Sequence, residues 1–172
     1  MNKLIELLRG LFAKPTAPTH KELSMNRQRL IDQLVFDEGV VHEIYLDHLG
    51  YPTFGVGHLI VEGDEEYGLP VGTPVEPSRV SEVFERDVDK YIGYTERAYA
   101  DCWDTLPGEV KEILVNMCFN LGPSRLSKFK NMNAAIRVGD WKTAAVEGRD
   151  SRWHKQVPNR AERLMVRLEM VE

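Results

Sequence analysis

Apolar residues recur every three or four positions after Pro77, and this periodicity most constrains what the chain can fold into. The repeating face consists of Val80, Val83, Phe84, Val88, Tyr91 and Ile92. Because proline suits the first turn of a helix, the pattern predicts one long helix from about residue 78 to 100. Asp140 is the expected N-cap of a later helix. The helices expected after the long one lie at about 107–121, 130–138, 141–148 and 159–170.

A different pattern lies before the long helix. Ser24 is the expected cap of a helix that ends at Glu38. Residues 44–47 then alternate between two faces, as in a strand, and residues 51–54 form the return strand of a hairpin. Pro52 in that return strand predicts an edge position, because proline donates no hydrogen bond to a neighbouring strand.

Together these patterns predict an α+β fold that is mostly α. A small β-hairpin lobe is expected at about residues 40–75, and a larger helical lobe at about 100–172. The long helix connects the two lobes. A chain of 172 residues is long enough for one domain with a sizeable core, and this domain is predicted to cover residues 23–172.

Residues 1–22 are predicted to form an N-terminal arm. Leu4, Leu7, Leu8 and Leu11 fall at helical spacing, and the prolines within residues 14–20 indicate an extended linker. The apolar run is too short to cross a membrane. It resembles an export signal, but Glu6 and Arg9 interrupt it and no small-residue cleavage site follows. Residues 1–20 therefore have three open roles, namely docking on the protein's own body, contact with a membrane surface, and contact with a partner protein.

The charge distribution excludes a general nucleic-acid-binding protein. The chain has 22 Lys and Arg residues against 27 Asp and Glu residues, so its net charge is −5. Residues 62–112 hold 5 basic and 14 acidic side chains, whereas residues 122–172 hold 11 basic and 6 acidic side chains. An anionic partner is therefore expected to meet the C-terminal part of the chain.

The residue types that commonly bind metals show no ligand spacing. Cys102 and Cys118 are expected to be free thiols of a protein made in a reducing compartment. His42, His48 and His58 flank a strand and a turn without the regular spacing of a metal site. No metal site is therefore predicted.

Three polar residues around the hairpin are candidates for catalysis. Glu38 ends a helix, Asp47 ends the first strand and Thr53 lies in the return strand. Two carboxylates and a hydroxyl suit an inverting glycosidase, in which one acid protonates the leaving oxygen while a carboxylate helps water to attack the opposite face. In a chain with 27 acidic residues, this spacing alone is weak evidence and is more typical of a solvated surface.

The residues around these three resemble the phage-type lysozymes, the endolysin family typified by the lysozyme of T-even coliphages. The resemblance begins with Phe-Asp-Glu-Gly, Tyr-Leu-Asp, Gly-Tyr-Pro-Thr and Gly-Val-Gly-His-Leu within residues 36–59. It continues in Asn-Met-Cys-Phe-Asn-Leu-Gly, Asp-Ser-Arg-Trp and Pro-Asn-Arg-Ala-Glu-Arg within residues 116–163. The motifs occur in family order over roughly residues 25–170, and they imply a lysozyme-like fold with two lobes.

The resemblance implies a role for each matching residue. Glu38 is expected to be the general acid, Asp47 the carboxylate that stabilises positive charge or orients water, and Thr53 the side chain that holds the nucleophilic water. The supporting residues are expected to be Arg160, which pairs with the catalytic glutamate, and His58 and Asp87, which pair to pin the hairpin lobe to the long helix. Leu59, Phe119 and Asn120 are expected to line the substrate cleft. The chain departs from the family pattern at two sugar-contact positions, Met132 and Glu147.

The function implied by the resemblance is that of a monomeric endolysin. Such an enzyme hydrolyses the β-1,4 bond between N-acetylmuramic acid and N-acetylglucosamine in bacterial peptidoglycan, without a cofactor, and so lyses the host cell. It is made in the host cytoplasm and reaches the periplasmic cell wall through membrane lesions made by a holin. Two alternatives remain open, a virion-associated tail lysozyme and a non-catalytic peptidoglycan-binding structural module.

Overall fold

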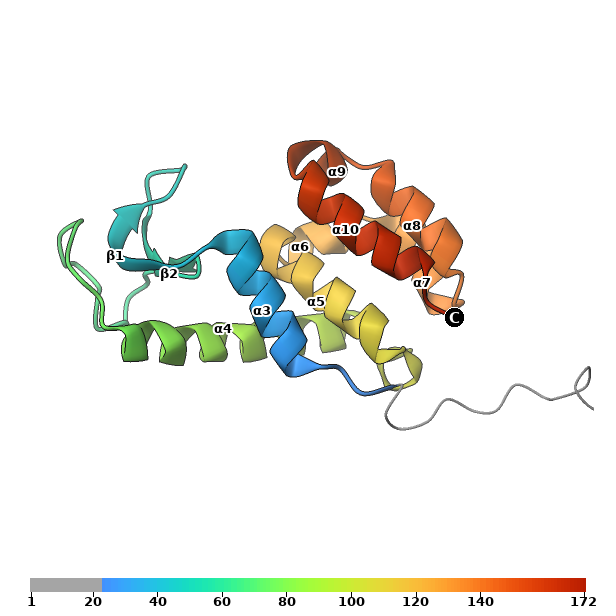
Figure 1. Ribbon diagram of the computed structural model, residues 1–172, viewed down its shortest axis with the longest axis horizontal. Helices are drawn as coiled ribbons and strands as arrows, with labels where there is room; N and C mark the ends of the chain where they lie inside the picture. Colours follow the sequence, from blue (N-terminus) through green and yellow to red (C-terminus); the bar gives the residue numbers. More distant parts are fainter. Residues whose placement is uncertain (1–22) are drawn as a thin grey trace, which may run out of the picture.

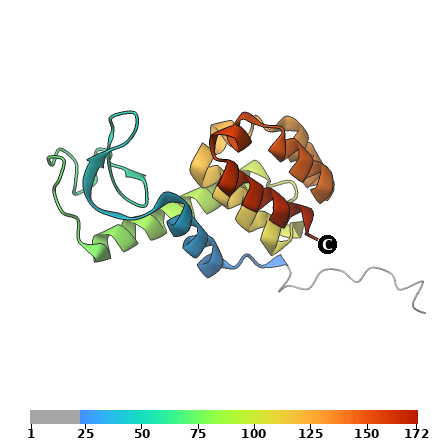
Figure 2. The same ribbon diagram turned by 45° about the horizontal axis from the view of Figure 1, so that its top comes forward.

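The computed structural model describes residues 23–172 as two lobes joined by a long helix (Figure 1). A small sheet lobe lies at one end and a group of helices at the other, and α4, Pro77–Ala98, runs between them. A second view shows the same arrangement (Figure 2). The predicted α+β, mostly α fold is therefore confirmed. The arm predicted for residues 1–22 lies outside the described residues.

The first described helix is α3, Arg27–Glu38. Its N-cap is Asn26, whose Oδ1 accepts a hydrogen bond of 3.0 Å from the backbone N–H of Arg29. The prediction that Ser24 caps this helix is wrong. The cap lies two residues later than predicted, at Asn26. The backbone N–H of Asn26 also makes a long-range contact, because it donates to the Glu112 carboxylate at 2.7 Å.

The sheet consists of β1, Val41–Leu46, β2, Pro52–Gly55, and β3, His58–Leu59. All neighbours are antiparallel and the order is β1-β2-β3, so β2 is the central strand. The prediction that Pro52 marks an edge strand is therefore wrong. Proline is tolerated here because it is the first residue of β2, where its carbonyl accepts a 2.9 Å hydrogen bond from the backbone N–H of Ile60.

Most of the apolar face predicted for α4 is buried, and this face joins the two lobes. Val80 and Val83 belong to the core of the sheet lobe, together with Ile44 of β1. One turn further along, Phe84 and Val88 pack into a second core beneath α3. Each part of α4 therefore buries its apolar side chains against a different set of elements, which fixes the sheet lobe relative to α3.

The remaining elements form the helical lobe. They are η1 (Trp103–Thr105), α5 (Gly108–Leu121), α6 (Pro123–Leu126), α7 (Lys130–Arg137), α8 (Trp141–Arg149), α9 (Arg152–Gln156) and α10 (Pro158–Glu169). Asp140 caps α8 as predicted, because its carboxylate accepts a 3.0 Å hydrogen bond from the backbone N–H of Thr143. The short elements η1, α6 and α9 were not predicted. Helix α5 is buried along most of its length and packs against α3, α4 and α10.

No helix within residues 23–172 is long and apolar enough to cross a membrane. In the same part of the chain, His, Cys, Asp and Glu side chains form no group of three or more that could hold a metal ion. Cys102 and Cys118 are both free thiols.

Candidate active site

The end of α3 places two consecutive carboxylates at different depths. The side chain of Asp37 is 3% exposed, whereas that of Glu38 is 24% exposed. Gly39 ends the helix with a φ of 74°, a conformation that glycine adopts without strain. The chain then turns into β1, so that Glu38 lies where the helix meets the sheet lobe. Its Oε1 accepts a 2.6 Å hydrogen bond from Nη1 of Arg160.

Arg160 of α10 is buried and holds its guanidinium in a network of polar groups. Its Nε donates to Oδ1 of Asn116 at 2.8 Å, and its Nη2 donates to the Asn116 carbonyl at 3.1 Å. Oδ2 of Asp37 lies 3.3 Å from the same Nε, while Oδ1 of Asp37 accepts a hydrogen bond from Arg163. The predicted pairing of Arg160 with Glu38 is present. Asp37, Asn116 and Arg163 stand in the quoted family motifs but were not singled out, because no local pattern shows that these three segments pack together.

Asp47 follows β1 and holds the turn that leads to β2. Its Oδ1 accepts hydrogen bonds from the backbone N–H groups of Tyr51 at 2.9 Å and Leu49 at 2.8 Å. These hydrogen bonds hold the pKa of Asp47 below its ordinary value, and the bond from Tyr51 has the largest effect. Burial acts in the opposite direction. The turn therefore favours an ionised carboxylate.

Tyr45 lies beside Thr53 on the sheet and is within reach of the charges of Glu38 and Asp47. Tyr45 of β1 and Thr53 of β2 are cross-strand partners, so their side chains share one face of the sheet. Burial first, and then the negative charges of Glu38 and Asp47, raise the pKa of Tyr45. Both carboxylates therefore lie close enough to act on the phenol. Thr53 is buried, and its Oγ1 donates to the Tyr51 carbonyl at 3.0 Å.

Tyr45 was not among the predicted site residues. Its alternation with Asp47 along the strand was the available signal, since residues two apart in a strand point to the same face.

Residues 36–169 match the family model of the phage lysozymes. The chain belongs to the phage lysozyme family. It is 32% identical over 154 residues to probable T4-type lysozyme 2 of Dictyostelium discoideum. That match covers 79% of this chain and 91% of the Dictyostelium protein. It is 30% identical over 166 residues to the pre-baseplate central spike protein Gp5 of Enterobacteria phage T4. That match covers 86% of this chain and 28% of Gp5.

A further phage relative shows the same partial coverage. The chain is 29% identical over 126 residues to the peptidoglycan hydrolase gp36 of Pseudomonas phage phiKMV, which covers 73% of this chain and 13% of that protein. This phage lysozyme chain therefore corresponds to nearly the whole of a small relative and to one part of two much longer phage proteins.

A second buried polar cluster links β3 to α4 in this member of the phage lysozyme family. Nδ1 of His58 lies 2.6 Å from Oδ2 of Asp87, as the resemblance implied, and Nε2 lies 3.1 Å from Oδ2 of Asp64. Asp64, which was not predicted, also accepts hydrogen bonds from Arg86 at 2.9 Å and from the Val61 backbone N–H at 2.9 Å. Both nitrogens of the imidazole therefore face a carboxylate, and the loop after β3 is tied to α4.

The residues expected to line the phage lysozyme cleft differ in exposure. Leu59 of β3 is 47% exposed and free to meet a ligand. Phe119 is half-buried and packs edge-on against Phe84, with ring centroids 6.1 Å apart. Oδ1 of Asn120 accepts a 2.8 Å hydrogen bond from Nε1 of Trp153. Asn120 is thus held in place by Trp153 of α9.

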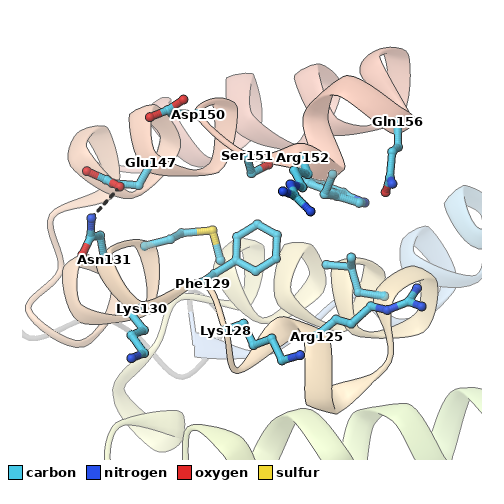
Figure 3. A pocket seen from close by; sticks show the side chains of 13 residues that line it. Arg125, Lys128, Phe129, Lys130, Asn131, Glu147, Asp150, Ser151, Arg152 and Gln156 are labelled. Atoms are coloured by element: carbon cyan, nitrogen blue, oxygen red, sulfur yellow. Dashed lines mark hydrogen bonds between the residues drawn. The ribbon is translucent and has the colours of Figure 1, made fainter.

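A hollow of about 680 Å³ lies apart from the predicted catalytic residues, between α6, α7, α8 and α9 (Figure 3). Phe129 stands at its centre, and cationic side chains extend around it. Within residues 23–172 these cations make no ion pair, whereas most other arginines of that range do. They are Arg125, Lys128, Lys130 and Arg152. The hollow is also lined by two acidic side chains, Glu147 and Asp150, so its four cations leave an excess of positive charge, in agreement with the basic C-terminal stretch.

The two positions that depart from the family pattern also line this hollow. Met132 is only 1% exposed, so it packs in the core and offers no polar group to a sugar. Glu147 accepts a 3.0 Å hydrogen bond from Nδ2 of Asn131, and Figure 3 shows the pair at one end of the hollow.

Proposed function

We propose that the protein is a muramidase that hydrolyses the β-1,4 bond between N-acetylmuramic acid and N-acetylglucosamine in bacterial peptidoglycan. The observation that carries the proposal is the position of Glu38, which is partly exposed at the junction of α3 with the sheet lobe and is held by a 2.6 Å hydrogen bond from the buried Arg160. Membership of the phage lysozyme family supports the same chemistry, as do relatives named as T4-type lysozymes and as a peptidoglycan hydrolase.

Glu38 is the proposed general acid. The glycosidic oxygen must receive a proton as its bond to the sugar breaks, and the donor must reach it from the protein. The Glu38 side chain is partly exposed, so it can contact a bound substrate, while the 2.6 Å bond to Arg160 keeps the carboxyl group oriented.

Asp47 and Thr53 are the proposed residues that act on water. Both backbone hydrogen bonds to Asp47 fall on Oδ1, so Oδ2 can accept a proton or a hydrogen bond from a water molecule. The hydroxyl proton of Thr53 is directed to the Tyr51 carbonyl, so the lone pairs of Oγ1 can orient the same water. Attack by that water on the face opposite the leaving group inverts the anomeric centre.

The test compares wild-type protein with Glu38→Gln on purified peptidoglycan from a Gram-negative bacterium. Wild type is expected to clear the suspension and to release new muramic-acid reducing ends, whereas Glu38→Gln is expected to lose at least a hundredfold in rate. Its melting temperature should stay close to that of wild type. Glu62→Gln, an exposed glutamate in the loop after β3, is the matched control and should retain full activity.

Other outcomes separate the alternatives. Retained lysis by Glu38→Gln would sink the assignment of the acid, and wall binding without lysis by either protein would favour a non-catalytic module. Proton NMR of the first product tests the stereochemistry, because an inverting enzyme releases the α-anomer from a β-linked substrate.

We propose further that the enzyme acts as an endolysin, made in the host cytoplasm and passing to the periplasmic wall through holin lesions. The match to the spike protein Gp5 favours a second candidate, a lysozyme carried by the virion. Mass spectrometry of purified virions separates the two. An endolysin is found in the lysate and is absent from virions, whereas a tail lysozyme copurifies with them in a fixed ratio.

A further inference from the structure

Two arginines and two carboxylates meet at the end of α3. Arg160 contacts both Glu38, at 2.6 Å, and Asp37, at 3.3 Å. Arg163, one turn further along α10, contacts the other oxygen of Asp37. Asn116 of α5 is the neutral member and bonds both Asp37 and Arg160. With all four charged side chains ionised, the cluster has no net charge.

Acid catalysis disturbs this balance. Under the proposed function, Glu38 must carry a proton before it can give one to the substrate, and a protonated Glu38 no longer neutralises Arg160. A buried guanidinium without a counter-ion is strongly unfavourable. Asp37 prevents this situation, because its buried carboxylate remains beside Arg160 whether or not Glu38 is charged.

We propose that Asp37 is a positioning residue that serves as the permanent counter-ion of Arg160 and thereby allows Glu38 to hold the catalytic proton. Arg163 has the opposite influence, since it competes with Arg160 for the charge of Asp37. The inference rests on the proposed function of Glu38 as general acid.

The other groups that face Glu38 do not upset this charge count. Tyr45 of β1 and Tyr91 of α4 both lie near it, and both phenols stay neutral under assay conditions. The pKa of each tyrosine is raised above its ordinary value near 10. Burial is the largest cause, and the negative charges of nearby acidic groups, which include Glu38, add to it. Asp47 also acts on Tyr45, and none of the substitutions below changes Asp47.

Two substitutions shift the balance in opposite directions. Asp37→Asn leaves two cations and one carboxylate, so the ionised form of Glu38 is favoured. The basic limb of the pH profile of kcat should then move down by about 1 pH unit. Arg163→Gln leaves one cation and two carboxylates, so the same limb should move up by a similar amount. KM should change by less than about twofold in either variant, because neither residue is assigned to substrate binding.

A second measurement tests the inference without turnover. The side-chain carboxyl of Glu38 is followed by carbon-13 NMR as the pH changes, and its signal is assigned from the spectrum of Glu38→Gln. Its titration midpoint should fall in Asp37→Asn and rise in Arg163→Gln. Asp32→Asn is the matched control, because Asp32 is an exposed residue of the same helix, hydrogen-bonded to Gln28 at 2.9 Å, and should cause no shift.

The counter-ion role is overturned if both variants lose activity equally at every pH, or if the Glu38 signal moves the same way in both. If Asp37→Asn does not fold, Arg163→Gln alone tests the inference. An upward shift of the Glu38 titration midpoint supports the counter-ion role, and the lack of that shift overturns it. A wild-type protein that releases no reducing ends refutes the proposed function, and the NMR titration still decides whether Asp37 controls the proton of Glu38.

Discussion

Asp87→Asn is predicted to weaken the protein far more than it weakens catalysis. The substitution removes the charge from the carboxylate that lies 2.6 Å from His58 in a buried contact between β3 and α4. Burial alone lowers the pKa of His58, but the hydrogen bonds and charges of Asp87 and Asp64 raise it above its ordinary value of 6.5. The folded protein therefore binds this proton more tightly than the unfolded chain does.

The magnitude follows from the contacts that are lost and kept. A hydrogen bond to a charged group contributes about 1.5–3 kcal/mol. Asp64 remains as a second carboxylate 3.1 Å from His58, so we expect a loss of about 2 kcal/mol in the free energy of unfolding. In a protein of this size, such a loss lowers Tm by roughly 4–8 °C.

The pH dependence gives the prediction a sign. The stabilisation from a raised histidine pKa is complete below the unfolded value of 6.5 and is lost as pH rises through the folded-state pKa. The difference between wild type and Asp87→Asn should therefore be largest near pH 5 and should shrink at alkaline pH. Within residues 23–172 neither His58 nor Asp87 bonds to Glu38 or Asp47, so kcat should stay within about twofold of wild type.

The assay is urea denaturation followed by circular dichroism at several pH values, with Asp89→Asn as the matched control. Asp89 lies on the same helix, and its ion pair with Arg27 at 2.7 Å is exposed, so its loss should cost less than about 1 kcal/mol. The reasoning is refuted if Asp87→Asn and Asp89→Asn have equal midpoints, or if the deficit of Asp87→Asn grows as pH rises.

Two further predictions concern the helical lobe. Gly148→Ala should lower Tm although alanine favours helices, because the added Cβ would lie 2.1 Å from Sδ of the buried Met165. We expect the free energy of unfolding to fall by about 1–3 kcal/mol. An unchanged or higher Tm in a thermal scan would contradict this prediction. Lys128→Gln should flatten the fall of wall lysis with added salt, because Lys128 lines the cationic hollow. Lys142→Gln, at an exposed position of α8 outside that hollow, is its control, and equal salt profiles for the two variants would count against steering by the hollow.

The long helices follow from the sequence alone. The predicted bounds of α4, α5, α7, α8 and α10 agree with the structure to within about two residues at each end. Periodic apolar residues and caps such as Asp140 act over one or two turns, so the signal is complete within the segment that folds. The motifs around Glu38, Asp47 and Thr53 are equally local, and they were sufficient to indicate the family.

The errors arise where a distant segment decides a local choice. Asn26 rather than Ser24 caps α3, and Glu112 holds the Asn26 backbone. Pro52 begins a central strand because β3 pairs with the far side of β2, which a rule based on proline alone does not anticipate. The short helices α6 and α9 have too few residues to show a period.

The arrangement of charge around the candidate catalytic acid was decided by the tertiary structure. The resemblance indicated that Arg160 pairs with Glu38, but Asp37, Asn116 and Arg163 become partners only because α3, α5 and α10 pack together. In the same way, Asp64 joins His58 and Asp87 only when the loop after β3 folds against α4. Helices and turns depend on neighbours along the chain, whereas burial and ion pairing depend on which surfaces meet. The sequence by itself therefore determined the long helices and the candidate catalytic residues, and packing determined which charges surround them.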